Sequence, residues 1–198
     1  MKVAWDEDEL KSTCNVASAE ARVAFGDNRI YIEHYIPNAR HIEIQIIGDS
    51  KGNIVHCFER DCSLQRRYQK MIEEAPSPAI TDELREKIAF SALMIARHIG
   101  YESVGTVDFI LECDSEAFFF LEMNTRIQVE HPITEIITGI DLVKEQIRIA
   151  AGEALNIKQE DIKINGHAIE CRINAESAAL DFNPCPGTIT EWTPPTEN

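Results

Sequence analysis

Acidic and amide side chains with the spacing of a metal site lie on two consecutive segments, 105–112 and 117–124, which both alternate like strands. If these segments form a hairpin, Asp108 lies directly opposite Glu122, and Asn124 lies one step further along the same face. Facing carboxylates repel each other unless a positive group lies between them. Three oxygen ligands on one hairpin suit Mg²⁺, especially one that already holds substrate phosphates. A solvated polar face on an edge hairpin explains the same spacing, and a register slip of one residue would destroy the pairing.

The next segment, 125–132, matches no periodic element and ends in proline, which indicates an irregular loop on a rigid scaffold. Arg126 has the fork geometry that clamps an anion, and Glu130 is a candidate base beside it. A surface ion pair is the ordinary explanation of the same two residues, and such a pair contributes little to stability.

A second polar group, residues 59–70, holds four cations in an otherwise acidic chain: Arg60, Arg66, Arg67 and Lys70. Such a group attracts phosphate or carboxylate ligands. A solvated basic surface explains it as well. Its position between strand-like segments is compatible with the wall of a site.

Helices and short strands must position these groups. Helical spacing of apolar residues, with a capping residue before and glycine after, predicts helices over 6–25, 81–99 and 142–151. Alternation predicts further strands over 29–36, 41–47 and 55–59, and a new strand from His167. In the segment 41–47, Ile42, Ile44 and Ile46 share one face, whereas Glu43 and Gln45 share the other.

The composition limits the class of protein. The chain has 198 residues, and 34 Asp and Glu against 19 Lys and Arg give a net charge of −15, which disfavours binding to nucleic acid. No apolar run is long enough to span a membrane, and the N-terminus does not have the pattern of a secretory signal. The 6 cysteines form no CxxC pair, which favours reduced thiols in a cytoplasmic protein.

Three motifs resemble one family closely, over about residues 1–195: ERDCSLQRRYQKMIEEAPSP, FLEMNTRIQVEHPITEIITGIDLVKEQIRIAAGE and GHAIECRINAE. They look like the biotin carboxylase component of acetyl-CoA carboxylase and of the related pyruvate, propionyl-CoA and methylcrotonyl-CoA carboxylases. The resemblance implies an α+β ATP-grasp fold, mainly an antiparallel sheet with packed helices. It assigns 1–157 to the ATP-grasp domain, and 166–198 to the start of the C-terminal domain.

The family's activity implies a ligase that uses ATP, Mg²⁺ or Mn²⁺ and bicarbonate to carboxylate biotin on a carrier protein, the first half-reaction of acetyl-CoA carboxylase in fatty-acid synthesis. The implied partners are the biotin carboxyl carrier protein and a carboxyltransferase component, and the full-length parent is expected to be a homodimer. The glycine-rich loop of the family would precede Met1, so we expect the isolated chain to be an inactive fragment. The alternatives are a noncatalytic module that docks on a full-length carboxylase, and a parent specific for pyruvate or another acyl-CoA.

The resemblance also implies roles for individual residues. The metal positions match Asp108, Glu122 and Asn124, the first two of which also meet ATP. The bicarbonate positions match Lys70, Arg126, Gln128 and Val129. Glu130 matches the base that deprotonates bicarbonate, and Arg172 matches the arginine that steadies the biotin enolate. The positions lining the adenosine pocket match Glu33, His34, Ile36, His41, Gln65 and Tyr68.

Three residues depart from the family pattern. Asp108 stands where Glu is usual, His34 where Lys is common and Tyr68 where His is common. The last two substitutions are expected to change the affinity for nucleotide rather than the type of reaction. Because Glu130 lies among other acids, we expect its surroundings to raise its pKa, as suits a base.

Overall fold

The structure is a computed structural model that describes residues 2–195, and the chain divides into two compact units, Met1–Ala39 and Arg40–Asn198. The first unit holds helix α1, Glu7–Phe25. The Asp6 side chain accepts hydrogen bonds from the backbone N–H groups of Asp8 and Glu9, and Gly26 ends the helix in the left-handed conformation. The predicted helix is therefore confirmed.

The strand predicted over 29–36 is wrong, because these residues form an extended segment that belongs to no sheet. A strand needs a neighbouring strand to satisfy its backbone groups, and the described residues of the first unit contain no other strand. Alternation of side chains along one segment does not supply that partner.

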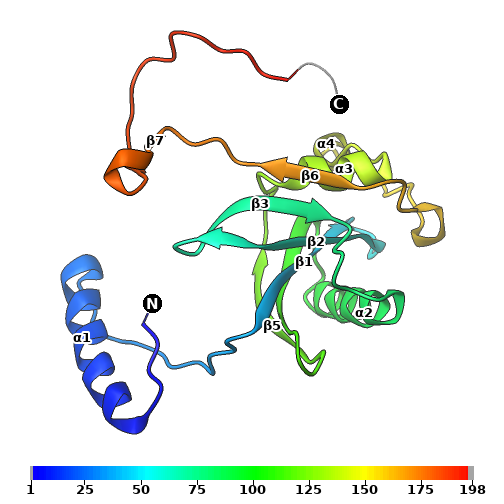
Figure 1. The fold of residues 1–198 in the computed structure, drawn as a ribbon. Coiled ribbons are helices and arrows are strands. Elements are labelled where there is room, and N and C mark those ends of the chain that lie inside the picture. Colours follow the sequence, from blue (N-terminus) through cyan, green and yellow to red (C-terminus); the bar gives the residue numbers. More distant parts are fainter. Residues whose placement is uncertain (1, 196–198) are drawn as a thin grey trace. The chain divides into compact units, whose positions relative to one another are not determined.

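The second unit is built on a six-stranded sheet with the order β5-β4-β1-β2-β3-β6 (Figure 1). The neighbours β1–β2, β2–β3, β3–β6 and β4–β5 pair in antiparallel fashion. The strands are β1 Ala39–Gly48, β2 Ile54–Arg66, β3 Gln69–Ala75, β4 Ser103–Glu112, β5 Phe118–Asn124 and β6 Ala168–Cys171. A separate two-stranded sheet pairs β7 Glu176–Ser177 with β8 Asn183–Pro184.

Helix α2, Asp82–His98, packs its apolar stripe against β1 and β4 and forms the largest core cluster. Thr81 caps the helix by accepting from the N–H of Leu84, as the sequence predicts. A second cluster packs α4, Leu142–Ala150, against Ile47, Val55 and Val104 of the sheet.

From Ile42 onward both faces of β1 are buried, the face with Glu43 and Gln45 included. Glu43 and Gln45 are as fully buried as the isoleucines between them. The alternation of residue types marks a charged layer inside the protein rather than a solvated surface, and a buried charge requires partners.

Two further elements were not predicted from the sequence. The polar residues 59–70 belong to a β2–β3 hairpin, and the end of the 125–132 segment begins helix α3, His131–Thr138. Pro132 lies in the first turn of α3, where proline is tolerated because the first N–H groups have no helical partner.

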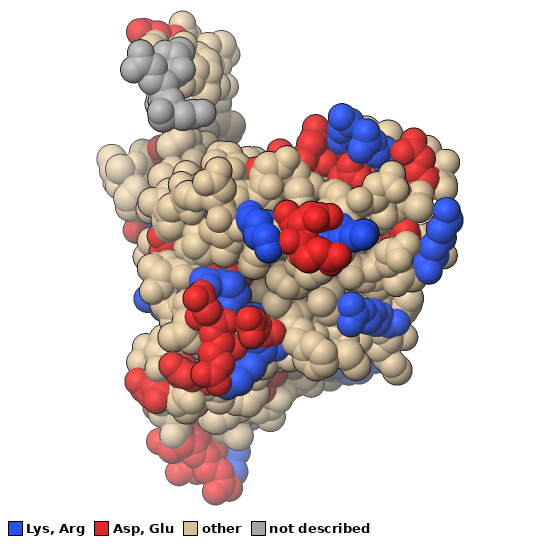
Figure 2. Space-filling view, turned by 90° about the vertical axis from the view of Figure 1, so that its right-hand side faces the viewer, with Lys and Arg blue, Asp and Glu red and all other residues tan. Residues whose placement is uncertain are grey.

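Strand β6 pairs with β3 at the edge of the main sheet, and its Ala168 packs with Ile133 and Ile137 of α3. The division into compact units falls after Ala39. It does not test the domain boundary expected between residues 157 and 166, which stays a prediction. Among the described residues, no helix is both long and apolar enough to span a membrane. Acidic and basic side chains lie in small mixed groups on the face drawn in Figure 2.

Candidate active site

A cavity of about 530 Å³ lies in the second unit, over the polar side of the sheet. It brings together side chains from β1, from the β2–β3 and β4–β5 hairpins, from the loop before α3 and from the segment after β6. Its lining is His41, Gln65, Tyr68, Gln69, Lys70, Asp108, Glu122, Asn124, Arg126, Gln128, Val129, Glu130, Arg172 and Asn174. Twelve of these fourteen residues carry roles implied by the family resemblance, and only Gln69 and Asn174 do not.

The hairpin register places Asp108 opposite Glu122 and Thr106 opposite Asn124, so the predicted pairing of the two carboxylates is confirmed. A register shift follows directly after Asp108, in the part of the hairpin near the turn. Asn124 Nδ2 lies 3.2 Å from Asp108 Oδ2 and 3.5 Å from Glu122 Oε1. All three predicted metal-binding side chains therefore meet at one point.

The donor set fits a divalent cation. Asp108 is almost fully buried, and its Oδ1 has no hydrogen-bond partner among the described residues. A buried carboxylate oxygen without a partner is costly, and a cation held between Asp108 and Glu122 would satisfy it. Asn124 would offer its Oδ1, which here accepts a hydrogen bond from Arg126 at 3.2 Å.

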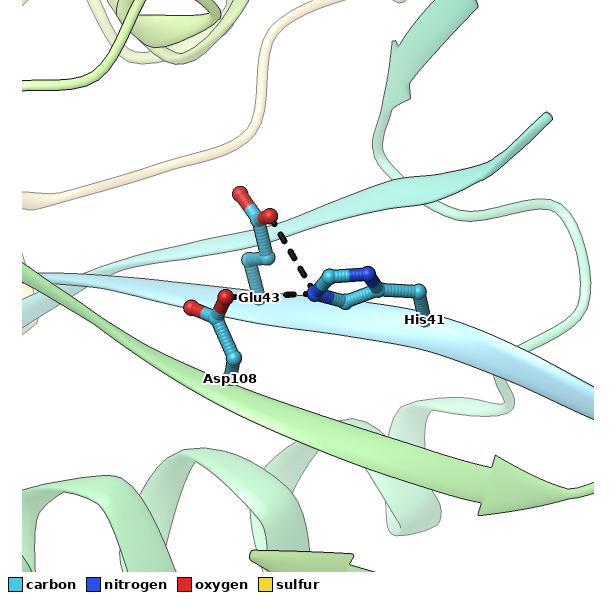
Figure 3. Close-up of side chains that lie close together, drawn as sticks. All are labelled: His41, Glu43 and Asp108. Carbon is cyan, nitrogen blue, oxygen red and sulfur yellow. Dashed lines mark hydrogen bonds and ion pairs between the residues drawn. The ribbon is translucent and has the colours of Figure 1, made fainter. Parts of the chain in front are cut away.

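His41 lies between two carboxylates, with Nε2 3.2 Å from Asp108 Oδ2 and 3.4 Å from Glu43 Oε1 (Figure 3). Gln65 fixes the tautomer of this imidazole. The Nε2 of Gln65 donates to the carbonyl of Cys62 at 2.8 Å and lies 3.0 Å from His41 Nδ1, so Nδ1 accepts and Nε2 carries the proton. His41 therefore donates to Asp108 and orients it.

Lys70 lies in the wall of the cavity, between two acidic side chains. Its Nζ forms ion pairs with Glu43 Oε1 and, at 2.6 Å, with Glu130 Oε1. The other oxygen of Glu130 accepts from Arg172 at 2.8 Å. Sequence reasoning did not single out Glu43, although a charged residue among isoleucines on a buried strand is a signal for a paired interior charge.

The expectation that the pKa of Glu130 is raised is wrong, because the pKa is lowered from its ordinary value. Burial acts to raise it, but the hydrogen bond and charge of Lys70, together with the charge of Arg60, outweigh burial. Acids do lie near Glu130 in space, but its two carboxylate oxygens contact the cations Lys70 and Arg172. Glu130 is therefore an ionised carboxylate at neutral pH.

Arg172 is held on its other side by Glu73, whose Oε1 accepts from Arg172 Nε at 2.6 Å. Glu73 is fully buried on β3 and pairs across the sheet with Glu170 of β6. Burial, followed by the charges of Glu73 and Glu130, raises the pKa of Glu170. Sequence reasoning missed Glu73, because its partner Arg172 lies 99 residues away along the chain.

Of the four cations in the 59–70 group, only Lys70 lines the cavity. Arg60 is buried inside the sheet layer. Arg66 forms an ion pair with Glu176, and Arg67 forms one with Asp181. The cluster is therefore not a single phosphate-attracting wall, because most of its charge is neutralised by acids far away in the sequence.

The residues implied for the adenosine pocket fall into both units. His41, Gln65 and Tyr68 line the cavity of the second unit. Glu33, His34 and Ile36 lie on the extended segment of the first unit, where Glu33 and His34 are exposed. Their role in holding a nucleotide stays a prediction.

Comparison with known proteins identifies relatives along almost the whole chain. Residues 1–158 match the family model described as the carbamoyl-phosphate synthase L chain, ATP-binding domain. A pyruvate carboxylase component from Methanothermobacter thermautotrophicus is 55% identical over 98% of this chain and 39% of its own length. Biotin carboxylase 1 of Bacillus subtilis is 50% identical over 98% of the chain and 43% of its own length.

Solved structures agree with these relatives. The biotin carboxylase of Campylobacter jejuni in complex with β-γ-ATP is 47% identical, with a TM-score of 0.93 over 100% of this chain and 44% of that one. The biotin carboxylase domain dimer of the Hydrogenobacter thermophilus 2-oxoglutarate carboxylase, in complex with MgADP, ADP and bicarbonate, is 50% identical. Its TM-score is 0.93 over 100% of this chain and 43% of that one. The chain thus spans about two fifths of the length of these relatives.

Proposed function

The chain belongs to the family of the carbamoyl-phosphate synthase L chain ATP-binding domain and resembles its biotin carboxylase members throughout, and we propose that its cavity serves ATP- and bicarbonate-dependent carboxylation of biotin. One observation carries this proposal. The cavity holds a carboxylate pair suited to a metal ion beside a set of cations and amides suited to a small anion. Transfer of a phosphoryl group to bicarbonate requires these two sites side by side.

In the proposed reaction, Asp108 and Glu122 would hold a Mg²⁺ ion, and this ion would neutralise part of the phosphate charge. Lys70 and Arg126 offset the repulsion between bicarbonate and the phosphates, both of which are anions. The Gln128 side chain and the backbone of Val129 complete the anion site. Arg172, fixed by Glu73, faces the same anion and steadies the negative charge that forms on biotin.

Glu130 acts as the base on bicarbonate in this proposal. Because Lys70 keeps it ionised, it is ready to accept a proton at neutral pH. An incoming bicarbonate ion shares Lys70 with Glu130, and this weakens the interaction that lowers the pKa. The arrival of the substrate therefore makes Glu130 a stronger base at the moment when one is required.

The finer assignments rest on the family. The biotin would be held by a carrier protein, and a carboxyltransferase component would choose the final acceptor. We propose acetyl-CoA, in cytoplasmic fatty-acid synthesis by a homodimeric parent. Pyruvate and 2-oxoglutarate are the competing acceptors, since relatives bear those names.

Calorimetric titration of the chain with ADP, with and without Mg²⁺, tests the proposal. We expect Mg²⁺ to tighten binding, and Glu122→Ala to abolish that gain while the circular dichroism spectrum stays unchanged. Glu112→Ala is the matched control, because this carboxylate lies on the same hairpin but outside the cavity. Binding that is indifferent to Mg²⁺, or lost equally in both variants, would refute a metal site at this hairpin.

A further inference from the structure

Arg60 is the largest side chain in the described part of the protein that is completely buried, and apart from its charge, which helps to lower the pKa of Glu130, it has no role above. Its Nη1 donates to Gln45 Oε1 at 2.8 Å and to Thr134 Oγ1 at 2.9 Å. Its Nη2 donates to Gln128 Oε1 at 2.9 Å and also lies 3.2 Å from Glu43 Oε2. A buried guanidinium costs several kcal/mol of desolvation, so contacts of this number and directness are needed to retain it.

The contact with Gln128 decides which end of that amide faces the cavity. The carbonyl oxygen of the Gln128 side chain is turned inward to Arg60, and Gln128 is itself buried while lining the cavity. The NH₂ group is therefore the end left for a ligand. An NH₂ group donates to an anion, whereas the carbonyl end would repel it.

The loop holding Gln128 is fixed at its backbone as well. The carbonyl of Gln128 accepts from the N–H of His131 at 3.4 Å and lies 2.8 Å from the His131 ring Nδ1. With the backbone fixed in this way, the side-chain amide of Gln128 can still rotate. The hydrogen bond from Arg60 to its carbonyl oxygen prevents that rotation.

We propose that Arg60 is a positioning residue that makes the bicarbonate pocket a donor site by fixing the orientation of the Gln128 amide. This inference rests on the proposed function, because it takes bicarbonate as the ligand. The guanidinium never touches the anion and acts through Gln128. Its forked geometry is essential, because a lysine at this position cannot hold Gln128 while also serving Gln45 and Thr134 on its other side.

The test is a titration of the 198-residue chain with ¹³C-labelled bicarbonate, followed by NMR, with calorimetric titration of MgADP beside it. Arg60→Lys keeps the charge next to Glu43, so no buried carboxylate is left unpaired. We expect it to weaken bicarbonate binding by about tenfold, the loss of a well-placed hydrogen bond, and to leave the affinity for MgADP within about twofold. Thr134→Val is the matched control, because it removes an acceptor from the side of Arg60 that faces away from Gln128; it should lower stability without changing bicarbonate affinity.

Gln128→Glu provides a variant expected to fold, since its carboxylate keeps the contact with Arg60 and the side-chain volume. It replaces the donor that faces the cavity with an acceptor, so bicarbonate binding should be lost. A double-mutant cycle then separates positioning from packing. In a Gln128→Met background, Arg60→Lys should have no further effect on bicarbonate binding, because its route of action has been removed.

The possible failures are distinguishable. A wild-type chain that takes up no bicarbonate would refute the anion site of the proposed function, and this inference with it. The inference alone would be overturned if Arg60→Lys bound bicarbonate as tightly as the wild type does, or if it lost the same affinity for bicarbonate with and without Gln128. Either result would assign Arg60 a purely structural role.

Discussion

Glu130 is held by a cation at each of its two oxygens, Lys70 on one and Arg172 on the other. The same Lys70 also serves Glu43, so one ammonium group neutralises two buried acids. Removal of one member of such a cluster destabilises the fold more than replacement of all its members by apolar residues. The reason is that the remaining charges stay buried without a partner. The site therefore depends on a balance of charge that a single substitution disturbs.

Lys70→Met should lower the free energy of unfolding by about 3–5 kcal/mol at neutral pH, the cost of leaving buried carboxylates unpaired. Because folding lowers the pKa of Glu130 from its ordinary 4.5, the wild-type carboxylate stabilises the fold above that pH and loses this contribution as the pH falls. The variant should lack this part of the pH dependence. Urea denaturation between about pH 3 and 7 measures both effects.

Lys87→Met is the control for that experiment. Lys87 forms an exposed ion pair with Glu83 on α2, and exposed pairs of this kind contribute little. An equal loss of stability in both lysine variants would contradict the argument.

At the scale of elements, the tip of the β2–β3 hairpin contributes Tyr68 to the cavity and is held by contacts distant in sequence. Arg67 and Tyr68, at the tip of the β2–β3 hairpin, have positive φ values of 52° and 64°, which are unfavourable for residues other than glycine. The guanidinium of Arg66 lies 4.4 Å from the ring centroid of Phe182 and pairs with Glu176, while Arg67 pairs with Asp181. These ion pairs and this cation–π contact with residues of the β7–β8 region hold the turn that contains Tyr68.

In the β1–β2 turn, the Asp49 carboxylate has a comparable role, because it accepts hydrogen bonds from residues near and far in the sequence. These hydrogen bonds give a pH-dependent prediction. Burial acts to raise the pKa of Asp49, but hydrogen bonds from the Asn53 side chain and from the N–H groups of Leu155, Asn53 and Lys51 lower it from 3.8 to about 2. Its stabilisation is therefore present above pH 3.8 and is lost as the pH falls toward about 2.

Asp49→Ala should destabilise the chain by about 2 kcal/mol at neutral pH, and by less at about pH 2.5, as measured by thermal unfolding. The exposed Asp161, in the short 3₁₀ helix Gln159–Asp161, provides the comparison through Asp161→Ala. A difference between wild type and Asp49→Ala that does not change with pH would show that the carboxylate charge is not the source of the effect.

At the scale of the whole chain, the two units differ in how much buried core their described residues contain. Helix α1 has no buried residue, whereas the second unit has three core clusters on its sheet and helices. Near the end of the first unit, residues 29–36 belong to no helix or strand and are mostly exposed. Segments of this kind are the preferred sites of proteolytic cleavage.

Brief digestion with trypsin should therefore cut first after Arg29, whose side chain is 88% exposed, and leave a resistant fragment that contains the whole second unit. Mass spectrometry of the early products identifies the cut, and Arg29→Gln should delay it. A first cut at the β2–β3 tip, after Arg66 or Arg67, would contradict the stability assigned to the second unit.

The local features of the fold could be predicted from the sequence alone. Thr81 and Asp141 cap their helices as predicted, and Asp6 caps α1 in the same way, because a cap needs only the next few residues. The pairing of Asp108 with Glu122 was predicted from a hairpin centred near Ser115, but the register shift after Asp108 is needed to reach it, because the next residue, Phe109, pairs with Phe120. The motifs that carry the family resemblance are short and continuous, so they too can be read directly from the chain.

The burial of charged residues and the identity of their partners could be known only from the folded structure. The strand predicted over 29–36 had the right alternation but no partner, and the polar face of β1 proved to be an interior layer. The pKa of Glu130 is lowered rather than raised because Lys70, 60 residues away along the chain, lies 2.6 Å from it in space. Coulomb interactions and desolvation depend on distances through space, and these exist only once the sheet has brought distant residues together.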